Sequence, residues 1–498
     1  MPKRKSLSIA LLTSFLVVIV LLVTFHWAGD LGGTVAQADT VPPLDSPTRQ
    51  EGAPVVRASG QYTVHLPIAL RLFDAAWQPI WGIQTTNYNV LNKAEEAGMA
   101  WIRVDAYWKN IEPTDNSYVW STLDDAISKS IAAGLTPIVD IVTNPTWADA
   151  DNTHCGPLKD NQYLTDFVTD LVNRYKGAPY NVKYWEIGNE VDHKYQISHD
   201  LYPWGGIGCW GDKVAEYVSF LRTAHDAIKA ADPDATILLG AISMIGNGGT
   251  GTEMNGDFVA DVLAEGGGPY FDVISYHFYN GQEYADYSCA DPPACTITGI
   301  VGKATIIRNW LADYPAYANK PLMLTEFAYR CGSDGICDSE ELQSQANYVP
   351  IYHLHSMAAD VKAVIWFTLN YPGFYGSSLL DINGNAKPAY TAYKAMTQEL
   401  HMYTYRRRMT TSETGGFSDV EGHYLSIGNS AHCWVLWCTG SSSRAVGFST
   451  SLSPSGKFRV VDVYGQNEQV LADGDDGVVD GKVTIQIGQS PQYVKNAP

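Results

Sequence analysis

Short apolar runs alternate with longer amphipathic runs along most of the chain. The apolar runs carry few polar residues, which is typical of parallel strands that are buried on both faces. Eight of them stand at residues 79–84, 101–107, 136–142, 182–190, 235–241, 271–279, 321–329 and 362–370. We expect one strand from each run.

The amphipathic runs between them have the period of helices. In residues 123–135, 163–177 and 214–233 the apolar side chains recur at three- and four-residue spacing, which gives a helix one apolar face. Eight strand–helix units over about 320 residues predict the α/β fold class and a closed (β/α)8 TIM barrel within residues 61–400. A doubly wound open sheet is the alternative arrangement of the same units.

The pattern changes after about residue 400, where helical periodicity stops. Apolar and polar positions alternate in residues 423–428, 458–465 and 482–488, and clusters of Gly, Ser and Asp separate these runs. Such alternation predicts a small antiparallel β-sandwich over residues 401–498. Residues 62–70 alternate in the same way and could add a strand to it.

The first 38 residues have the pattern of a secretory signal. Basic residues at positions 3–5 precede an apolar stretch, and no charged residue follows until Asp30. Ala-Gln-Ala at residues 36–38 offers a small-residue cleavage site. We therefore predict a signal peptide over residues 1–38 and a secreted or extracytoplasmic protein.

The same stretch supports a second interpretation. Residues 7–27 are apolar over a length that can span a bilayer, so the segment can instead be an uncleaved anchor. Only in that case do we expect the membrane as a partner. Residues 39–60 are rich in proline and polar side chains, and they predict a flexible tether in either case.

Composition narrows the classes of ligand. The formal net charge is −20, and so acidic a surface repels nucleic acid, which binds to basic patches. A neutral substrate suits it better. Aromatic residues make up 12% of the chain, and they either fill the core or serve as stacking platforms for sugar rings. We expect a monomer that needs no cofactor.

Eight cysteines, an even number in a chain with an export signal, predict disulfides. Cys289 and Cys295 flank a Pro-Pro turn, and Cys331 and Cys337 flank a glycine-containing loop, so each pair can close locally. A zinc site is the rival explanation, but no Cys-x-x-Cys or His-x-x-x-His spacing supports it. We therefore expect no metal.

The remaining four cysteines leave two pairings open. If residues 433–438 form one extended strand, the Cα atoms of Cys433 and Cys438 lie about 16 Å apart, which is too far for a disulfide. Either a bend brings these two together, or they pair with Cys155 and Cys209.

Candidate catalytic residues stand at the carboxyl ends of two predicted strands. In a barrel of this kind the active site lies at that end of the strands. Asn189 and Glu190 finish the run "YWEIGNE", and Glu326 lies near the end of the run that contains "MLTEF". Two facing carboxylates are what glycoside hydrolysis needs, because one protonates the leaving oxygen while the other attacks or activates water.

The motifs "WEIGNE" and "LTEF" resemble clan A of the retaining glycoside hydrolases, the 4/7 superfamily, with families 39 and 5 nearest. The resemblance covers residues 78–400 and extends to several other strand ends. Those positions are Arg103 in "WIRVD", "WKNIEP" at 108–113, "HFY" at 277–279, Trp366 in the eighth run and "LLDINGNAKPAY" at 379–390.

The resemblance implies a role for each matching residue. Glu190 would be the acid/base, Glu326 the nucleophile, and Asn189 the residue that holds the sugar 2-hydroxyl. Arg103 and Tyr279 would keep the nucleophile ionised. His277 would contact substrate or orient its neighbours, and Trp366 would lie under the bound sugar.

Other residues near the strand ends have two interpretations. Asp105 and Asp140 are either substrate contacts or paired carboxylates of the barrel interior. Glu186 shares the parity of Glu190 one layer deeper, and we interpret it as structural. Glu112 precedes a proline in a loop, which favours an architectural role.

Two loops raise further possibilities. Trp147 and Trp204 follow the third and fourth strands and would be sugar platforms or loop cores. "GNGGTG" at 246–251 matches a dinucleotide-binding pattern, but that fingerprint should follow a strand tightly and open a helix. Here it does neither, so we interpret it as a loop beside the cleft.

These inferences together predict a retaining β-glycosidase that acts on a polysaccharide or oligosaccharide. The two glutamates should then lie about 5–5.5 Å apart. The rival from another class is a non-catalytic carbohydrate-binding or surface-display protein on a barrel scaffold, because fold alone does not grant function.

Overall fold

The computed structural model describes residues 80–150, 154–194, 208–243, 254–280, 299–332 and 336–497. The predictions of a signal or anchor, a tether, a strand at 62–70 and a loop at 246–251 lie outside these residues. So do Trp204 and the pair Cys289 and Cys295.

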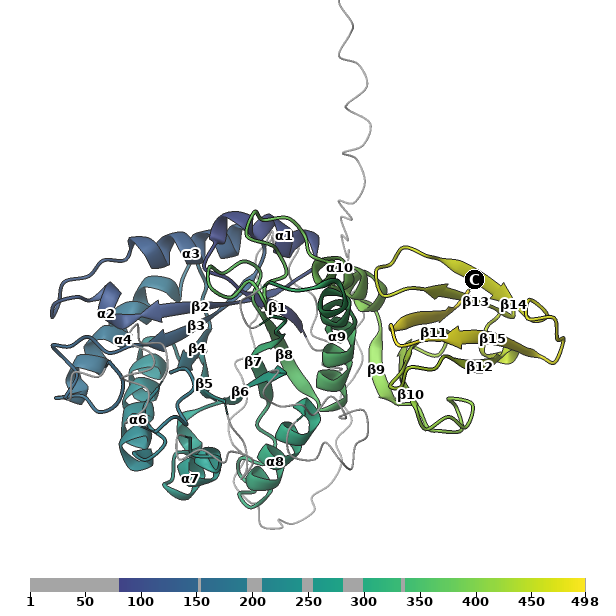
Figure 1. Cartoon of the computed structure of the whole chain (residues 1–498). Coiled ribbons are helices and arrows are strands. Elements are labelled where there is room, and N and C mark those ends of the chain that lie inside the picture. The colour runs from purple at the N-terminus through teal and green to yellow at the C-terminus, as the bar shows by residue number, and fades with distance from the viewer. Residues whose placement is uncertain are drawn as a thin grey trace, which may run out of the picture. The chain divides into compact units, whose positions relative to one another are not determined.

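Eight parallel strands pair in sequence order and close into a barrel, because β1 pairs with both β2 and β8 (Figure 1). The strands are β1 (Ile80–Gln84), β2 (Trp101–Tyr107), β3 (Thr136–Val142), β4 (Tyr184–Ile187), β5 (Thr236–Ile242), β6 (Val273–Asn280), β7 (Leu322–Tyr329) and β8 (Val361–Phe367). The predicted (β/α)8 barrel is confirmed, and the open sheet is excluded by the β1–β8 pairing.

Helices follow the strands and cover the outside of the barrel (Figure 1). They are α1 (Leu91–Glu96), α2 (Trp108–Ile111), α3 (Ser121–Ala132), α4 (Asn161–Tyr175), α6 (Val214–Ala231), α7 (Phe258–Ala264), α8 (Ile300–Ala312), α9 (Ser339–Ala358) and α10 (Pro388–Leu400). Asp338 and Glu341 begin α9 with a capping box, which satisfies amide groups that the first turn leaves unpaired.

The barrel interior changes from apolar to polar along several of the strands. Its lower layer is a separate apolar cluster of Trp101, Ile138, Leu238, Val273, Met323, Ala363 and Ile365. Because side chains alternate along a strand, the residues two positions further on face the same interior. On β2, β3 and β6 these are Arg103, Asp140 and Ser275, all buried. The layer below the mouth is therefore charged.

An extra residue in β7 breaks this alternation. Tyr276 and His277 of β6 are consecutive, but they pair with Leu324 and Glu326 of β7. The register against β8 shifts at the same place. This is the signature of a β-bulge at Thr325, and a bulge redirects the side chains that follow it. As a result both Thr325 and Glu326 face polar partners inside the barrel.

The chain after the barrel forms two antiparallel sheets. One holds six strands in the order β14-β13-β16-β11-β10-β9, and the other pairs β12 with β15. The strands are β9 (Thr404–Arg408), β10 (Val420–Ile427), β11 (Ala431–Cys438), β12 (Arg444–Ser449), β13 (Lys457–Val461), β14 (Gln469–Ala472), β15 (Lys482–Ile487) and β16 (Gln492–Asn496). Burial alternates along β12 and β15, and the predicted sandwich is confirmed.

The sandwich packs on α9 and α10 of the barrel. Leu425, Val435 and Tyr493 belong to the same apolar core as the barrel helices. Glu399, near the end of α10, accepts hydrogen bonds from Arg459 at 2.7 and 3.1 Å. Its carboxylate also lies 2.7 Å from Lys495 Nζ. Apolar packing and a charged contact therefore both join the two domains.

The cysteines pair differently from the two alternatives left open by the sequence. Cys155 pairs with Cys209, and Cys331 pairs with Cys337 as predicted. Cys433 and Cys438 are buried free thiols on the single strand β11. No bend intervenes between them, so the extended strand keeps them apart, and neither proposed partner is available.

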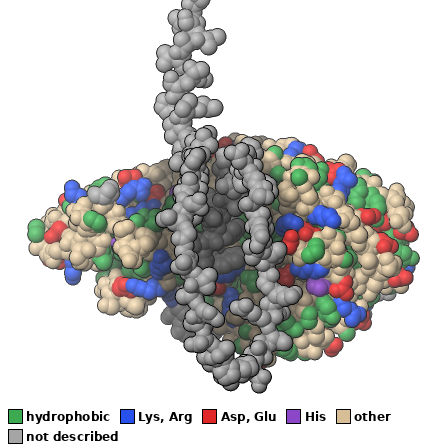
Figure 2. All heavy atoms as spheres, turned by 180° about the vertical axis from the view of Figure 1, so that it is seen from behind, with side chains coloured by type: hydrophobic (Ala, Val, Ile, Leu, Met, Phe, Trp, Pro, Cys, Tyr) green, Lys and Arg blue, Asp and Glu red, His purple; other side chains and the backbone are tan. Residues whose placement is uncertain are grey.

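Among the residues with assigned structure, no helix combines the length and apolar character needed to cross a bilayer. On the face shown in Figure 2, basic, acidic and hydrophobic side chains are interspersed.

Candidate active site

Arg103 is the centre of the barrel mouth. Its Nε donates to Glu186 at 2.5 Å, and Nη2 donates to Asp140 at 2.5 Å and to Asn189 Oδ1 at 2.8 Å. Nη1 donates to Glu326 Oε1 at 2.6 Å and to Gln84 Oε1 at 3.3 Å. A guanidinium has five N–H donors, so every donor of this buried side chain has a partner.

Glu326 is held from two sides by charge-assisted hydrogen bonds. Arg103 binds Oε1, and the hydroxyl of Tyr279 donates to Oε2. Burial raises the pKa of Glu326 above its usual value, and the neighbouring His277, Arg103 and Tyr279 act in the opposite direction. The β7 bulge places this carboxylate in the mouth, where the sequence predicted a nucleophile.

Glu190 follows β4 and faces Glu326 across His277. The Nδ1 of His277 lies 3.2 Å from Glu190 Oε1 and 3.7 Å from Glu326 Oε2. Two oxygens that share one neighbour at these distances are less than about 7 Å apart, which includes the retaining spacing of about 5–5.5 Å and excludes most of the inverting range. Glu190 also has a positive φ of 46°, a costly conformation that is typical of functional sites.

The segment that carries Asn189 and Glu190 is fixed by close backbone packing. The N–H of Gly208 donates to Asn189 O at 2.6 Å, and the adjacent Cys209 is linked to Cys155 in the loop after β3. Gly240 of β5 lies beneath this segment, and a Cβ there would come within 2.4 Å of Ile187 O. Only glycine permits so close an approach.

His277 is buried between the two candidate glutamates. Burial lowers its pKa to about 4, and its Nε2 has no hydrogen-bond partner among the described residues. Its backbone carbonyl accepts a hydrogen bond from Lys303 of α8 at 2.9 Å, and the same Nζ donates to Ser243 O at 2.6 Å. Lys303 therefore ties the end of β5 to β6, a role that its helical position did not reveal.

A second histidine beside Glu190 was missed by the sequence analysis. His193 Nε2 lies 3.6 Å from Glu190 Oε2, and Ser243 Oγ lies 3.2 Å from the same nitrogen. Ser243 Oγ also contacts both carboxylate oxygens of Asp192 at 3.2 Å. The only signal in the sequence was the three-residue spacing from Glu190 to His193.

The other carboxylates of the mouth are paired within the protein. Glu186 is fully buried between Arg103 and Thr325, whose hydroxyl donates to it at 2.9 Å, as its structural interpretation predicted. Asp140 is also fully buried, and its Oδ1 has no hydrogen-bond partner among the described residues. Burial raises the pKa of Asp140 well above its usual value. Asp105, which is partly exposed, accepts from Gln84 and Tyr107.

Trp366 does not line the mouth. It is fully buried, donates its indole N–H to Ser377 O at 2.9 Å and packs against Phe327. Ala363 and Ile365 of β8 face the barrel interior. Because side chains alternate along a strand, Phe367 also faces inward, and Trp366 faces outward. The expected position under a sugar therefore does not belong to Trp366.

Aromatic side chains after β8 form a wall beside Tyr279. The ring of Phe367 lies 6.0 Å from Tyr279, 5.7 Å from Tyr371 and 5.1 Å from Phe374. Phe374 is 41% exposed, so this wall reaches solvent next to the candidate nucleophile. The strand-end pattern did not predict this wall, because Tyr371 and Phe374 belong to a loop.

Glu112, in the loop after β2, has contacts that suit an architectural role. Glu112 accepts hydrogen bonds from Trp108 Nε1 at 2.7 Å and from the Asn116 N–H at 2.8 Å. Trp147 donates to Glu112 O at 2.9 Å and packs edge-to-face on Tyr163. Trp147 is therefore part of a loop core.

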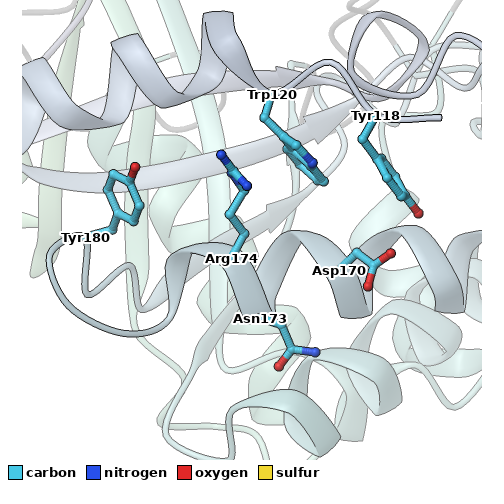
Figure 3. Close-up of a pocket in the computed structure, with 6 residues that line it drawn as sticks. All are labelled: Tyr118, Trp120, Asp170, Asn173, Arg174 and Tyr180. Atoms are coloured by element: carbon cyan, nitrogen blue, oxygen red, sulfur yellow. The ribbon is translucent and has the colours of Figure 1, made fainter. Parts of the chain in front are cut away.

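A wide pocket of about 530 Å³ lies away from this mouth, between the start of α3 and the end of α4 (Figure 3). It is lined by Tyr118, Trp120, Asp170, Asn173, Arg174 and Tyr180. Arg174 lies over the Trp120 ring at 5.2 Å, and Tyr118 stacks on the same tryptophan. None of the predicted site residues lines this pocket. The candidate active site is therefore the mouth at the strand ends.

Comparison with known proteins identifies the family of the chain. A family model described as cellulase (glycosyl hydrolase family 5) matches residues 56–370. No curated protein matches the chain.

Several solved structures share the fold. A family 39 glycoside hydrolase from the gut symbiont Bacteroides cellulosilyticus WH2 is 17% identical, with a TM-score of 0.62 over 85% of this chain and 81% of that one. A glucosidase from Croceicoccus marinus is 14% identical, with a TM-score of 0.57 over 84% and 95%. A GH30 endoxylanase from Clostridium papyrosolvens C71 is 14% identical, with a TM-score of 0.55 over 85% and 98%. At these identities the likeness concerns the fold.

Proposed function

The chain belongs to the cellulase family, glycosyl hydrolase family 5, and is a retaining O-glycosyl hydrolase; from that premise we propose that Glu190 is its acid/base and Glu326 its nucleophile. One observation carries the proposal. Both carboxylates contact Nδ1 of the same histidine, His277, so they face each other across a space that fits one glycosidic bond. Family membership disfavours the non-catalytic alternative.

The two glutamates divide the reaction between them. In the first step Glu326 attacks the anomeric carbon while Glu190 gives its proton to the leaving glycosidic oxygen. In the second step Glu190 takes a proton from water, and the resulting nucleophile releases the sugar from Glu326. Glu326 must be ionised to attack. The hydrogen bonds from Arg103 and Tyr279 favour that form and oppose the effect of burial on its pKa.

Asn189 and the aromatic wall would position the sugar. Asn189 accepts from Arg103 through Oδ1, so its amide nitrogen is the atom suited to donate to the 2-hydroxyl. Phe374 and Tyr371 pack on Phe367, whose ring lies beside Tyr279, and aromatic faces are apolar surfaces on which a sugar ring can stack. We assign to this wall the platform role that Trp366 does not have.

The substrate is a polysaccharide or oligosaccharide, and we propose that the bond cleaved is a β-glycosidic bond. We also propose that the enzyme is secreted or anchored outside the cytoplasm. The signal-like residues 1–38 support this, and so do the disulfides Cys155–Cys209 and Cys331–Cys337. We also propose that the enzyme acts as a monomer.

Trapping the covalent intermediate tests the assignment. A slow-turnover 2-fluoro β-glycoside should label Glu326, and mass spectrometry of the peptides should locate the label. The first screen uses aryl β-glycosides and soluble β-glucans, mannans and xylans to find the sugar. Glu326→Gln should abolish turnover on every substrate.

The acid/base has a different signature. Glu190→Gln should still be glycosylated by substrates with good leaving groups, yet lose about 10²–10⁴-fold on natural linkages. Azide should then restore turnover on the activated substrate and give a β-glycosyl azide. Glu216→Gln, an exposed change on α6, is the control and should behave as wild type. Label on Asp105, Glu112 or Glu186, with Glu326→Gln still active, would overturn the assignment and leave the family unchanged.

A further inference from the structure

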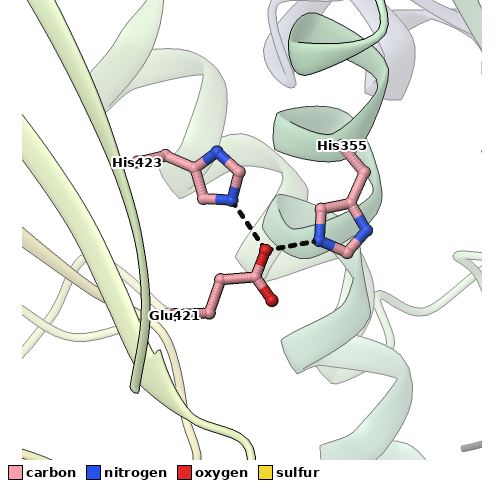
Figure 4. Close-up of side chains that lie close together, drawn as sticks. All are labelled: His355, Glu421 and His423. Atoms are coloured by element: carbon pink, nitrogen blue, oxygen red, sulfur yellow. Dashed lines mark hydrogen bonds and ion pairs between the residues drawn. The ribbon is translucent and has the colours of Figure 1, made fainter. Parts of the chain in front are cut away.

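A second cluster of polar side chains lies at the contact between the barrel and the sandwich (Figure 4). Glu421 and His423 are two residues apart on β10, so they share one face of the strand. His355 comes from the last turn of α9. This turn leads into the start of β8, which is the end of the barrel opposite the mouth.

Both imidazoles point the same nitrogen at one carboxylate oxygen (Figure 4). His355 Nε2 lies 2.9 Å and His423 Nε2 lies 3.1 Å from Glu421 Oε1. All three atoms lie within 4.8 Å of one another. In a tetrahedral zinc site with bonds of about 2.0–2.1 Å, neighbouring ligand atoms are about 3.3 Å apart. The two histidine nitrogens lie within 4.8 Å of each other, so rotations of the side chains would bring the three ligand atoms to this spacing.

The surroundings orient the cluster in the way that metal ligands are oriented. The second ring nitrogen of His423, Nδ1, lies 3.1 Å from the hydroxyl of Tyr405, and its ring stacks on Trp437 at 5.3 Å. A partner at Nδ1 that accepts its proton leaves Nε2 unprotonated and able to bind metal. The side chains of His423 and Glu421 are 1% and 4% exposed, whereas that of His355 is 20% exposed. The histidine of α9 thus offers a route of entry.

We propose that His355, Glu421 and His423 bind one divalent transition-metal ion of the Zn²⁺ type, with water as the fourth ligand. Two imidazoles and one carboxylate are a common zinc ligand set. The ion would join α9 of the barrel to β10 of the sandwich and would have no part in catalysis. No sequence motif announced it, because 66 residues separate His355 from Glu421.

One neighbour opposes the ion and provides the sharpest test. Arg408 Nε lies 3.5 Å from Glu421 Oε1, and its side chain is 36% exposed. A second cation on the same oxygen would repel the metal, so Arg408 must turn toward solvent when the ion binds. Arg408→Gln should therefore tighten metal binding several-fold.

The experiment uses the full chain, stripped with a chelator and then equilibrated with buffered Zn²⁺. Elemental analysis should find one bound ion per chain, and Tm should rise with free Zn²⁺. Glycosidase turnover below Tm should not change. Co²⁺ in place of Zn²⁺ should give the visible absorption of a tetrahedral nitrogen–oxygen site.

Glu421→Gln separates a metal site from a hydrogen-bonded contact. Glutamine keeps a carbonyl acceptor for both histidines but removes the charged ligand, so the apparent Kd should rise about 100-fold or more. His401→Gln on the exposed end of α10 should bind as wild type. If no ion binds to the wild type, or if Glu421→Gln retains it, the proposal is overturned. The same holds if Arg408→Gln weakens binding.

Discussion

Arg103 in the barrel mouth and Glu399 at the sandwich contact are opposites in charge. Arg103 is one cation that donates hydrogen bonds to three carboxylates, those of Asp140, Glu186 and Glu326, and lies 4.0 Å from a fourth, Asp105. Glu399 is one carboxylate bound by two cations, Arg459 and Lys495. The Arg103 side chain is 1% exposed and that of Glu399 is 12% exposed.

The two arrangements shift carboxylate pKa values in opposite directions. In the mouth, burial and the excess of negative charge raise the pKa of Asp140 well above its usual value. At the contact, burial opposes ionisation, but Arg459 and Lys495 lower the pKa of Glu399. The contact is built for stability, whereas the mouth keeps groups poised to exchange protons, as functional sites do.

Removal of the central charge should have the largest effect. Arg103→Met leaves buried carboxylates without their cation, and we expect a loss of about 3–5 kcal/mol in the free energy of unfolding. Arg459→Met should cost about 1 kcal/mol or less, because Lys495 still holds Glu399 and the pair is partly solvated. Urea unfolding followed by tryptophan fluorescence measures both. Equal losses would contradict the comparison.

Tyr279→Phe should remove one hydrogen bond to Glu326 and leave its ion pair with Arg103 in place. A hydrogen bond to a charged group is worth about 1.5–3 kcal/mol, so kcat/KM should fall about 10–100-fold. The ionised form of Glu326 loses a donor, its pKa rises further, and the acid limb of the pH profile should move up by about one pH unit. Tyr276→Phe, on the outward face of the same strand, is the control. An unmoved acid limb would remove Tyr279 from this role.

The pH dependence of stability should have opposite signs at the two sites. A raised folded pKa means that stability is lost as pH rises from the unfolded value of about 3.9. The free energy of unfolding of Asp140→Asn, relative to that of wild type, should therefore increase by up to about 1.4 kcal/mol per pH unit above pH 4. Glu399, with a lowered pKa, contributes stability above about pH 4.3 that is lost on acidification. Glu399→Gln should thus be less stable than wild type at neutral pH and as stable as wild type in acid. Solvent screening should reduce the slope of this difference with pH.

Both profiles can be read from chemical unfolding at a series of pH values. If the two differences from wild type changed in the same direction with pH, the two sites would not be electrostatic opposites.

The smallest effect should come from the aromatic wall. Phe374→Ala removes an exposed ring that contacts Phe367 and Tyr371, so KM should rise a few-fold with little change in stability. Ile382→Ala, which is 70% exposed in the next loop, should leave KM unchanged. A parallel change in both variants would exclude a specific platform.

The sequence predicted the barrel well because burial on both faces leaves a local mark. The resemblance predicted seven site residues, and all of them except Trp366 lie together in the barrel mouth. They could be found because parallel strands all place their carboxyl ends at one rim. Their roles remain predictions until the trapping experiment is done.

What the sequence did not predict depends on register and on distant partners. The bulge at Thr325 and the outward position of Trp366 are matters of strand register. One inserted residue exchanges the inward-facing and outward-facing positions of the residues that follow it. His193 reaches Glu190 through a loop, and Cys155 meets Cys209 across 54 positions. Neither contact has a periodic signal in the chain.

The disulfide between Cys155 and Cys209 has a consequence for proteolysis. It closes a covalent ring that contains α4, β4 and the pair Asn189–Glu190. A protease that cuts one peptide bond inside this ring cannot release the acid/base from the rest of the chain, since the two fragments stay linked through sulfur. A nicked enzyme would therefore run as one chain until a thiol reagent is added. Only then would the segment that carries Glu190 be free to leave.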